Sequence, residues 1–294
     1  MPTNEQRRAN AKRKLQRQLE RRAQQERRRR TVAIVGGGVA VAAAIAAIVA
    51  GVVLTNRHHD GNQASGAAGS SSTSATSGPV SGPPLPTVKA TADPGANCQY
   101  PPSREPAAKQ VEPPRQGKVP TDPAQVSVSM VTNQGHVGLL LANNESPCTV
   151  NSFASLAQKK FFDGTKCHRL TTGDSSSILQ CGDPSADGTG GPGYEFANEY
   201  PTNQYPPGDP ALKQPVVYPR GTLAMANSGL NTNGSQFFMV YKDTLLPPQY
   251  TIFGKIQQDG LDTLDKIAKG GVAGGGADGP PATEVIITSV QVDQ

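Results

Sequence analysis

The stretch Asn231-Thr-Asn-Gly-Ser-Gln-Phe-Phe238 decides the fold, because it changes abruptly from a polar turn to aromatic residues. Its glycine and amide side chains favour a loop, whereas residues 236–240 favour a strand. That strand would present one polar group, Gln236, beside the large apolar surface of Phe238. Such a pair suits a groove that holds an apolar ring and hydrogen-bonds the peptide backbone next to it.

Other short motifs surround this stretch in the sequence. They are His168-Arg169, Gln180-Cys-Gly-Asp183, Gly188-Thr-Gly-Gly191, Met225-Ala-Asn227 and Phe253-Gly-Lys255. In this order and spacing they resemble the signature of the cyclophilins, the barrel-shaped peptidyl-prolyl cis-trans isomerases. The resemblance extends from about Val126 to the C-terminus. It implies a closed eight-stranded antiparallel barrel capped by two helices.

The pattern of apolar residues also predicts a mainly β domain. Alternation predicts strands at 126–130 and 284–292, and a turn at 133–135 leads into a returning strand. Ser146, as N-cap, and Pro147 predict a helix to about residue 160. A second helix is expected near 261–269, and short strands near 166–170, 178–182, 222–226, 236–241 and 251–256. This pattern fits a barrel or sandwich better than a parallel sheet.

The N-terminal third has a different composition. Residues 1–30 hold 12 Lys/Arg and 3 Asp/Glu, while the remaining 264 residues hold 16 and 20, so the positive charge belongs to the tail. Residues 31–55 carry no charge and are long enough to span a bilayer. The basic cluster before them predicts a cytoplasmic N-terminus. We therefore expect a single-pass cell-membrane protein whose C-terminal domain is extracytoplasmic.

Two alternatives to this membrane anchor are less consistent with the sequence. A cleaved signal peptide has an apolar region of about 7–15 residues with a small-residue cleavage site, whereas this run is longer and Asn56-Arg-His-His-Asp60 follows it. A nucleic-acid-binding arm would explain the basic tail but not the apolar run after it. We expect no nucleic-acid partner.

Residues 56–122 are predicted to be an extracytoplasmic linker, first rich in Ser and Gly and then in Pro. Cys98 and Tyr100 break this composition and suggest a short region tied to the domain, which is expected at 123–294. The four cysteines, Cys98, Cys148, Cys167 and Cys181, all lie on the predicted outer side. Two disulfides are compatible with this count, and the sequence leaves all three pairings open.

Metal and nucleotide chemistry find little support in the sequence. The cysteines form no Cys-x-x-Cys pair, so we expect no metal site. Gly188–Gly193 matches a dinucleotide-binding glycine pattern, but Pro192 lies near its end and Tyr194-Glu-Phe follows without helical periodicity. We expect no cofactor.

The resemblance implies specific site residues. Arg169 falls on the family's catalytic arginine, with Gln180 and Phe238 in the same catalytic group. The remaining positions match substrate-binding residues: Ile178, Ala226, Asn227, Ser228, Gln236, Leu246 and Tyr250. Asn227 would act through its main chain, and Tyr250 stands where many members carry histidine. His168 would point away from the groove and serve as a core or hydrogen-bonding residue.

Some positions depart from the family pattern. The spacing from Arg169 to Gln180 is about three residues longer than usual, and Ser177 stands where the family has an aromatic pocket residue. Leu245 falls where cyclosporin-sensitive members carry tryptophan, so we expect weak or no cyclosporin binding. The insertion 198–218 is interpreted as a solvent-exposed loop, with a lid or a groove extension as alternatives.

These observations predict a monomeric, membrane-anchored isomerase that assists the folding of exported proteins, with activity reduced by the change at Ser177. Its substrates would be proline-containing polypeptides. The alternative is a scaffold or chaperone that binds proline-containing segments on the same fold without useful turnover.

Overall fold

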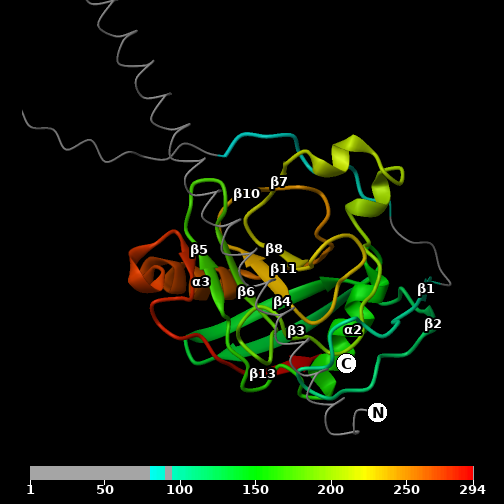
Figure 1. The fold of residues 1–294 in the computed structure, drawn as a ribbon, viewed down its shortest axis with the longest axis horizontal. Coiled ribbons are helices and arrows are strands. Elements are labelled where there is room, and N and C mark those ends of the chain that lie inside the picture. Colours follow the sequence, from blue (N-terminus) through cyan, green and yellow to red (C-terminus); the bar gives the residue numbers. More distant parts are fainter. Residues whose placement is uncertain (1–79, 90–94, 294) are drawn as a thin grey trace, which may run out of the picture. The chain divides into compact units, whose positions relative to one another are not determined.

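The computed structural model describes residues 80–89 and 95–293 (Figure 1). The predicted basic tail, the predicted transmembrane helix at 31–55 and the first part of the predicted linker lie outside these residues. Within the part of the chain that is described, no helix combines the length and the apolar character needed to cross a membrane.

One curled, antiparallel nine-stranded sheet dominates the described residues, in the order β12-β5-β6-β9-β8-β11-β4-β3-β13. Its strands are β3 (Gln125–Thr132), β4 (Gly135–Ala142), β5 (Arg169–Thr171), β6 (Ile178–Cys181), β8 (Thr222–Met225), β9 (Phe237–Val240), β11 (Ile252–Ile256), β12 (Asp278–Gly279) and β13 (Ile287–Val292). The chain before β5 also contacts the start of β13. There Cys167 N–H donates to Val285 O and Ile287 N–H donates to Thr165 O, each at 2.9 Å.

Two α-helices accompany the sheet, as the sequence predicted. They are α2 (Pro147–Gln158) and α3 (Gln258–Gly270). The helix α3 packs on β4, where the Thr263 hydroxyl donates to His136 O at 2.7 Å. Residues 80–89 and 95–293 also contain three short 3-10 helices: η1 (Thr202–Gln204), η2 (Pro210–Lys213) and η3 (Ala273–Gly275).

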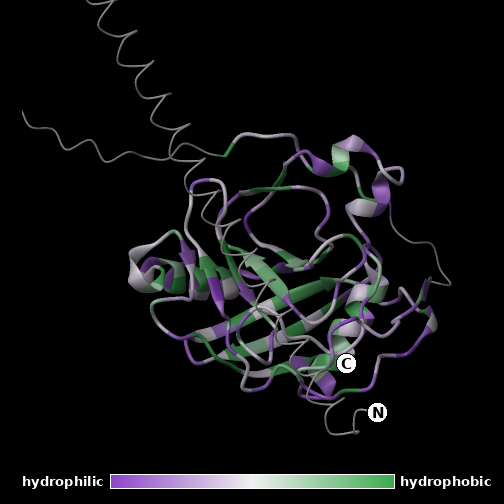
Figure 2. Ribbon diagram, in the orientation of Figure 1, coloured by the Kyte–Doolittle hydropathy of each residue, from purple (hydrophilic) through white to green (hydrophobic). Residues whose placement is uncertain are grey.

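The sheet buries apolar side chains on both faces, which Figure 2 shows as hydrophobic strands. On one face, Phe153 of α2 packs against Phe162, Phe237 and Phe253, with ring centroids 5.0–5.4 Å apart. On the other face, Phe238 and Val240 enter a second apolar cluster. Successive residues of a strand point to opposite faces, so β9 supplies both clusters.

The second cluster is referred to below as the outer cluster. Its buried members are Ile178, Tyr200, Val216, Tyr218, Ala224, Phe238, Val240 and Ile252. Part of it comes from the 198–218 insertion, which contains η1, η2 and β7 (Val216–Tyr218) and pairs with β10 (Thr244–Leu246). The interpretation of this insertion as a solvent-exposed loop is therefore wrong for its buried residues Tyr200, Leu212, Val216 and Tyr218, whereas 206–208 and 213–215 are exposed as expected. Its apolar residues have no regular spacing, and only the tertiary structure brings them onto the outer face of the sheet.

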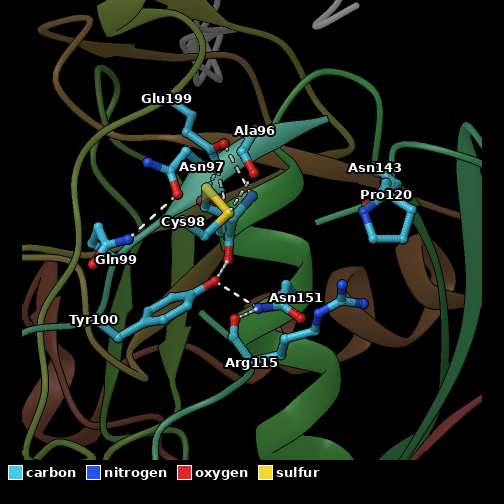
Figure 3. Close-up of a disulfide and its surroundings, with 12 residues drawn as sticks. Ala96, Asn97, Cys98, Gln99, Tyr100, Arg115, Pro120, Asn143, Asn151 and Glu199 are labelled. Atoms are coloured by element: carbon cyan, nitrogen blue, oxygen red, sulfur yellow. Dashed lines mark hydrogen bonds between the residues drawn. A yellow bond between two sulfur atoms is a disulfide. The ribbon is translucent and has the colours of Figure 1, made fainter. Parts of the chain in front are cut away.

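Part of the predicted linker packs on the domain. Residues 95–122 contain β1 (Ala96–Cys98) and β2 (Gly117–Val119), and Cys98 forms a disulfide with Cys148 at the start of α2 (Figure 3). The Tyr100 hydroxyl donates to Cys148 O at 2.7 Å and accepts from the Asn151 amide at 2.8 Å. The expectation that Cys98 and Tyr100 are tied to the domain is confirmed. The second disulfide joins Cys167 to Cys181.

A distant carboxylate, not the side chain of Ser146, caps the N-terminus of α2. The Ser146 hydroxyl donates to Ile252 O, whereas Glu199 accepts from the N–H of Cys148 (3.0 Å) and from the N–H and hydroxyl of Thr149 (2.8 and 2.7 Å). The first N–H groups of a helix lack intrahelical partners, so an acidic group stabilises them. The prediction of Ser146 as the N-cap residue is confirmed, although its side chain makes no capping hydrogen bond.

The ionisation of Glu199 predicts a pH dependence of stability. Burial raises the pKa of Glu199 from 4.5 to about 7, and hydrogen bonds from Thr149 and Cys148 only partly oppose the rise. Between these values the folded state keeps a proton that the unfolded chain releases. The contribution of Glu199 to the free energy of unfolding should therefore fall as pH rises from about 4.5 to about 7, against the opposite contribution of His168, whose pKa is lowered by burial.

Denaturant unfolding across this pH range tests the expectation. Glu199→Gln, which is neutral at every pH, should flatten the slope. The control Glu105→Gln changes an exposed carboxyl and should keep the wild-type slope. An unaltered slope in Glu199→Gln would contradict the assignment.

Candidate functional site

Three of the predicted polar site residues form one hydrogen-bonded chain across neighbouring strands. Arg169 of β5 lies opposite Gln180 of β6, and its Nη1 donates to Gln180 Oε1 at 3.3 Å. Gln180 Nε2 donates to Gln236 Oε1 at 2.9 Å. Gln236 Nε2 in turn donates to the carbonyls of Gly188 and Gly190, each at 3.0 Å. Each side chain in the chain therefore orients the next.

Asp278 of β12 holds the other side of the arginine. Its two carboxylate oxygens accept from Arg169 Nε and Nη2, both at 2.8 Å, which is a bidentate pair. The hydrogen bond raises the pKa of Arg169 further above its ordinary value and holds the pKa of Asp278 below its own. The guanidinium is thus a fixed cation that points Nη1 toward Gln180.

The sequence analysis missed Asp278. It lies in a two-residue strand 109 positions after Arg169, within a glycine-rich stretch that carries no periodic pattern. Only the pairing of Asp278 with Thr171 in the sheet brings it to the arginine. An acidic residue alone in such a stretch gives no signal of its own.

The predicted apolar wall is assembled beside the arginine. Ile178 and Phe238 belong to the outer cluster, and Ala226, Leu246 and Tyr250 pack against it. The rings of Phe238 and Tyr250 meet edge to face at a centroid distance of 5.7 Å. Phe238 pairs in register with Gln180, so the wall begins directly next to the hydrogen-bonded chain.

The predicted peptide-binding edge follows β8. The Ala226 N–H donates to Gln236 O at 2.9 Å, which fixes this edge to the polar chain. The side-chain amide of Asn227 donates to Gln249 O at 2.8 Å, and the Ser228 N–H donates to the hydroxyl of Thr232 at 3.0 Å. Because the side chain of Asn227 is already hydrogen-bonded to Gln249, its main chain is the part that could bind a peptide.

The ring nitrogens of His168 and the side chain of Ser177 are buried and do not line an open groove. Burial lowers the pKa of His168, and its ring nitrogens have no hydrogen-bond partner among the residues described. The lowered pKa favours the neutral form of the ring. Ser177 is buried, its hydroxyl donates to Gly173 O at 3.3 Å and its N–H donates to Thr244. The lengthened loop thus folds back on itself at the position where the family carries a ring.

Two further features bear on cofactors. Within residues 80–89 and 95–293, no group of three His, Cys, Asp or Glu side chains could hold a metal ion. After the glycine pattern ending at Gly193, Tyr194 forms a β-bridge with Pro102 instead of opening a helix. A dinucleotide site needs a helix at that point.

The arrangement suits a reaction that requires no nucleophile. An apolar wall beside a fixed guanidinium can hold a proline ring and donate a hydrogen bond to its nitrogen. Rotation about an X-Pro bond disrupts amide resonance, and the nitrogen then becomes a better acceptor. A donor that acts only on this twisted state lowers the barrier.

Comparison with known proteins gives the same assignment. Residues 127–292 match the family described as cyclophilin type peptidyl-prolyl cis-trans isomerase/CLD. A probable peptidyl-prolyl cis-trans isomerase B of Mycobacterium tuberculosis strain H37Rv is 75% identical over 293 residues, which cover 100% of this chain and 95% of that protein. The protein with the same printed name from Mycobacterium leprae is 68% identical over 295 residues and covers 100% of both chains.

Among solved structures, a cyclophilin type isomerase from Cryptosporidium parvum is 29% identical with a TM-score of 0.46, and covers 58% of this chain and 98% of that one. The family match spans more than half of the sequence, and the relatives span all of it. The chain therefore belongs to the cyclophilin-type peptidyl-prolyl cis-trans isomerase family.

Proposed function

We propose that this peptidyl-prolyl cis-trans isomerase acts through Arg169 on proline-containing polypeptides. The proline ring packs against Phe238, and the Arg169 guanidinium donates to the prolyl nitrogen as the amide twists. The observation that carries this proposal is that Arg169 is held on two sides. On one side it forms a bidentate pair of hydrogen bonds with Asp278, called the Asp278 fork below, at 2.8 Å, and on the other it donates to Gln180. A guanidinium held from both sides needs little reorganisation when the acceptor develops.

The experiment uses the full-length protein in detergent micelles. Isomerisation of an X-Pro peptide is followed beside peptide binding, measured by fluorescence anisotropy. Catalysis together with binding supports the proposal. Binding without acceleration would leave the alternative, a non-catalytic scaffold or chaperone, to which the loop at Ser177 lends some support.

Asp278 is proposed as a positioning residue, because it touches the arginine and not the substrate. Asp278→Asn keeps the size of the side chain but weakens the fork. Both partners are about half exposed, so the pair is worth at most about 1 kcal/mol, or roughly a fivefold loss in kcat. KM should hardly change, since the proline wall is intact. Asp278→Glu should restore part of the rate.

The matched control is Glu284→Gln, which breaks the similarly exposed pair with Lys166. Its kcat and KM should stay at wild-type values. Equal losses in both variants would indicate a general effect of surface charge rather than positioning of Arg169.

We further propose that the sheet closes into a barrel through residues 164–167 and 285–287, and that residues 31–55 anchor the domain outside the cell membrane. The hydrogen bonds of Cys167 and Ile287 across that seam support closure of the barrel.

The charge distribution supports the membrane anchor, and the two disulfides suit an oxidising compartment. Exported, proline-containing proteins would then be the substrates of a monomeric enzyme. Protease added to intact cells should digest the domain, and full protection would contradict the topology.

We also propose weak cyclosporin binding, because Leu245 stands where cyclosporin-sensitive members carry tryptophan. Leu245 offers a smaller apolar surface than the tryptophan of sensitive members, and the closely approaching Gly82 backbone shares its environment. Isomerase activity should persist at cyclosporin concentrations that inhibit a sensitive cyclophilin.

A further inference from the structure

Residues 80–89, a piece of the predicted linker, lie against the outer cluster. They form the cyan segment of Figure 1, near β7 and β10. Leu85 and Val88 are half-buried and pack against the cluster. Residues 83–88 are called the strap below. Its position is unexpected for a proline-rich spacer, which the composition alone would leave in solvent.

The strap is bound by its carbonyl groups. The Val217 N–H of β7 donates to Pro83 O at 2.9 Å, and the Tyr200 hydroxyl donates to Pro86 O at 2.8 Å. The opposite edge of β7 is already paired with β10. The strap therefore binds β7 at its remaining edge, as an added extended chain does in β-augmentation.

The chemistry of the strap and its site is complementary. The site offers two donors, the Val217 N–H and the Tyr200 hydroxyl. Pro83, Pro84 and Pro86 have no N–H, so at these three positions the strap presents carbonyl acceptors and no backbone donor that needs a partner. A proline-rich chain is also extended before it binds and loses little conformational entropy. The site is thus suited to an extended proline-containing segment.

The strap shares its apolar surface with the substrate groove. Leu85 and Val88 pack on the same outer cluster that contains Phe238 and Ile178. Gly82 passes so close to Leu245 of β10 that a Cβ there would lie 2.6 Å from Leu245 Cδ2, and Leu246 of the predicted wall packs on the same outer cluster as Leu85 and Val88. Strap and wall are therefore neighbours on one continuous surface.

Little of the wall beneath is open to solvent in this structure. Phe238 is 2% exposed and Ile178 is 5% exposed, and both Leu85 and Val88 pack on the cluster that contains them. The insertion is held by several buried residues, whereas the strap is held by two hydrogen bonds and two half-buried apolar side chains. The strap therefore has fewer attachments to the outer cluster than the insertion has.

We propose that the strap is a built-in, competing ligand: a proline-containing segment of the chain's own linker that occupies the β7 edge and restricts access of polypeptide substrates to the proline groove. This inference rests on the proposed function for its kinetic consequence. Its binding consequence, a second site for proline-rich chains at β7, stands independently of turnover.

The kinetic test uses the full-length protein in micelles with two substrates, an X-Pro tetrapeptide and an unfolded proline-containing protein. Leu85→Ser/Val88→Ser should release the strap and raise kcat/KM for the protein substrate about tenfold, with a smaller gain for the tetrapeptide. Tyr200→Phe removes only the hydroxyl and should raise kcat/KM for the protein substrate about threefold.

There are two matched controls. Ser81→Ala/Thr87→Ala changes exposed side chains in or beside the strap, and Tyr205→Phe changes a second tyrosine of the insertion. Both should behave as wild type.

A binding test separates this inference from the proposed function. A labelled peptide with the sequence of residues 81–89 is titrated onto each protein and followed by fluorescence anisotropy. It should bind the Leu85→Ser/Val88→Ser variant, whose site is vacated, at least tenfold tighter than wild type. Adding Tyr200→Phe should weaken that binding, whereas adding Arg169→Ala should not, because the peptide occupies the β7 edge.

The outcomes are distinct. If no protein isomerises either substrate but the peptide binds as expected, the catalytic proposal fails and the β7 site stands. If the variants turn over substrate at the wild-type rate and the peptide binds all proteins equally, the strap is ordinary packing and the inference is overturned. A loss of activity in the released variant would overturn it equally.

Discussion

Replacement of Arg169 by alanine should lower kcat/KM for X-Pro isomerisation by about 10²–10³-fold, the usual cost of removing one donor to a developing charge. The donor is lost in the twisted state, where the prolyl nitrogen accepts most strongly, so the loss should appear in kcat. Peptide affinity should change little, since Phe238 and the remaining wall are untouched. Arg169→Lys should recover only a small part, because an ammonium cannot occupy the Asp278 fork and reach the substrate together.

A second arginine of the fold provides a close control for this measurement. Arg220 donates to both carboxylate oxygens of Asp265, at 2.7 and 2.8 Å, and its side chain is 36% exposed against 44% for Arg169. Arg220→Ala therefore removes a similar fork away from the groove. Its kcat/KM should stay within about twofold of wild type. A comparable loss in both variants, or wild-type turnover in Arg169→Ala, would remove Arg169 from the mechanism.

Thermal unfolding separates the chemical effect from a folding defect. The Arg169–Asp278 pair is about half exposed, and such pairs contribute at most about 1 kcal/mol to stability. The midpoint of Arg169→Ala should therefore lie within a few degrees of wild type. A rate loss of two or more orders of magnitude in a folded variant belongs to the transition state.

Local patterns in the sequence predicted the hairpin of β3 and β4, both helices and the motif-bearing strands β5, β6 and β9. These elements are encoded by alternation, turn residues and cap positions within a few residues of each other. Arg169, Gln180 and Phe238 could be assigned together because each lies within a recognisable motif on adjacent strands.

Other parts could not be predicted because they depend on pairings between distant residues. Asp278 reaches Arg169 from 109 positions away, and Glu199 reaches the start of α2 from about 50. Neither carries a local signal. The strap had the composition of a free spacer, and only the donors of Val217 and Tyr200 give its proline carbonyls a binding site.

Loss of the Cys98–Cys148 disulfide should have the largest effect on stability. The bridge closes a segment of 50 residues, which corresponds to roughly 4 kcal/mol of unfolding free energy in the chain-entropy account. The double variant Cys98→Ser/Cys148→Ser should lose about that amount in denaturant unfolding. Because the cross-link joins β1 to α2 beside Tyr100, protease should then cut first within residues 95–122 (Figure 3).

The second disulfide separates stability from catalysis. Cys167–Cys181 closes only 14 residues, so Cys167→Ser/Cys181→Ser should cost roughly 3 kcal/mol, less than the first pair. Cys167 lies two positions before Arg169, and Cys181 directly follows Gln180. Removing this bridge loosens the two strands that carry the catalytic pair, and kcat should fall severalfold in the folded protein. The Cys98/Cys148 variant, assayed where it is still folded, should keep its kcat because its bridge joins β1 to α2 rather than β5 to β6. A reversed pattern, with kcat lost on opening the Cys98–Cys148 bridge and kept without the Cys167–Cys181 bridge, would mean that residues 95–122, and not the β5–β6 pair, hold the groove in its working geometry.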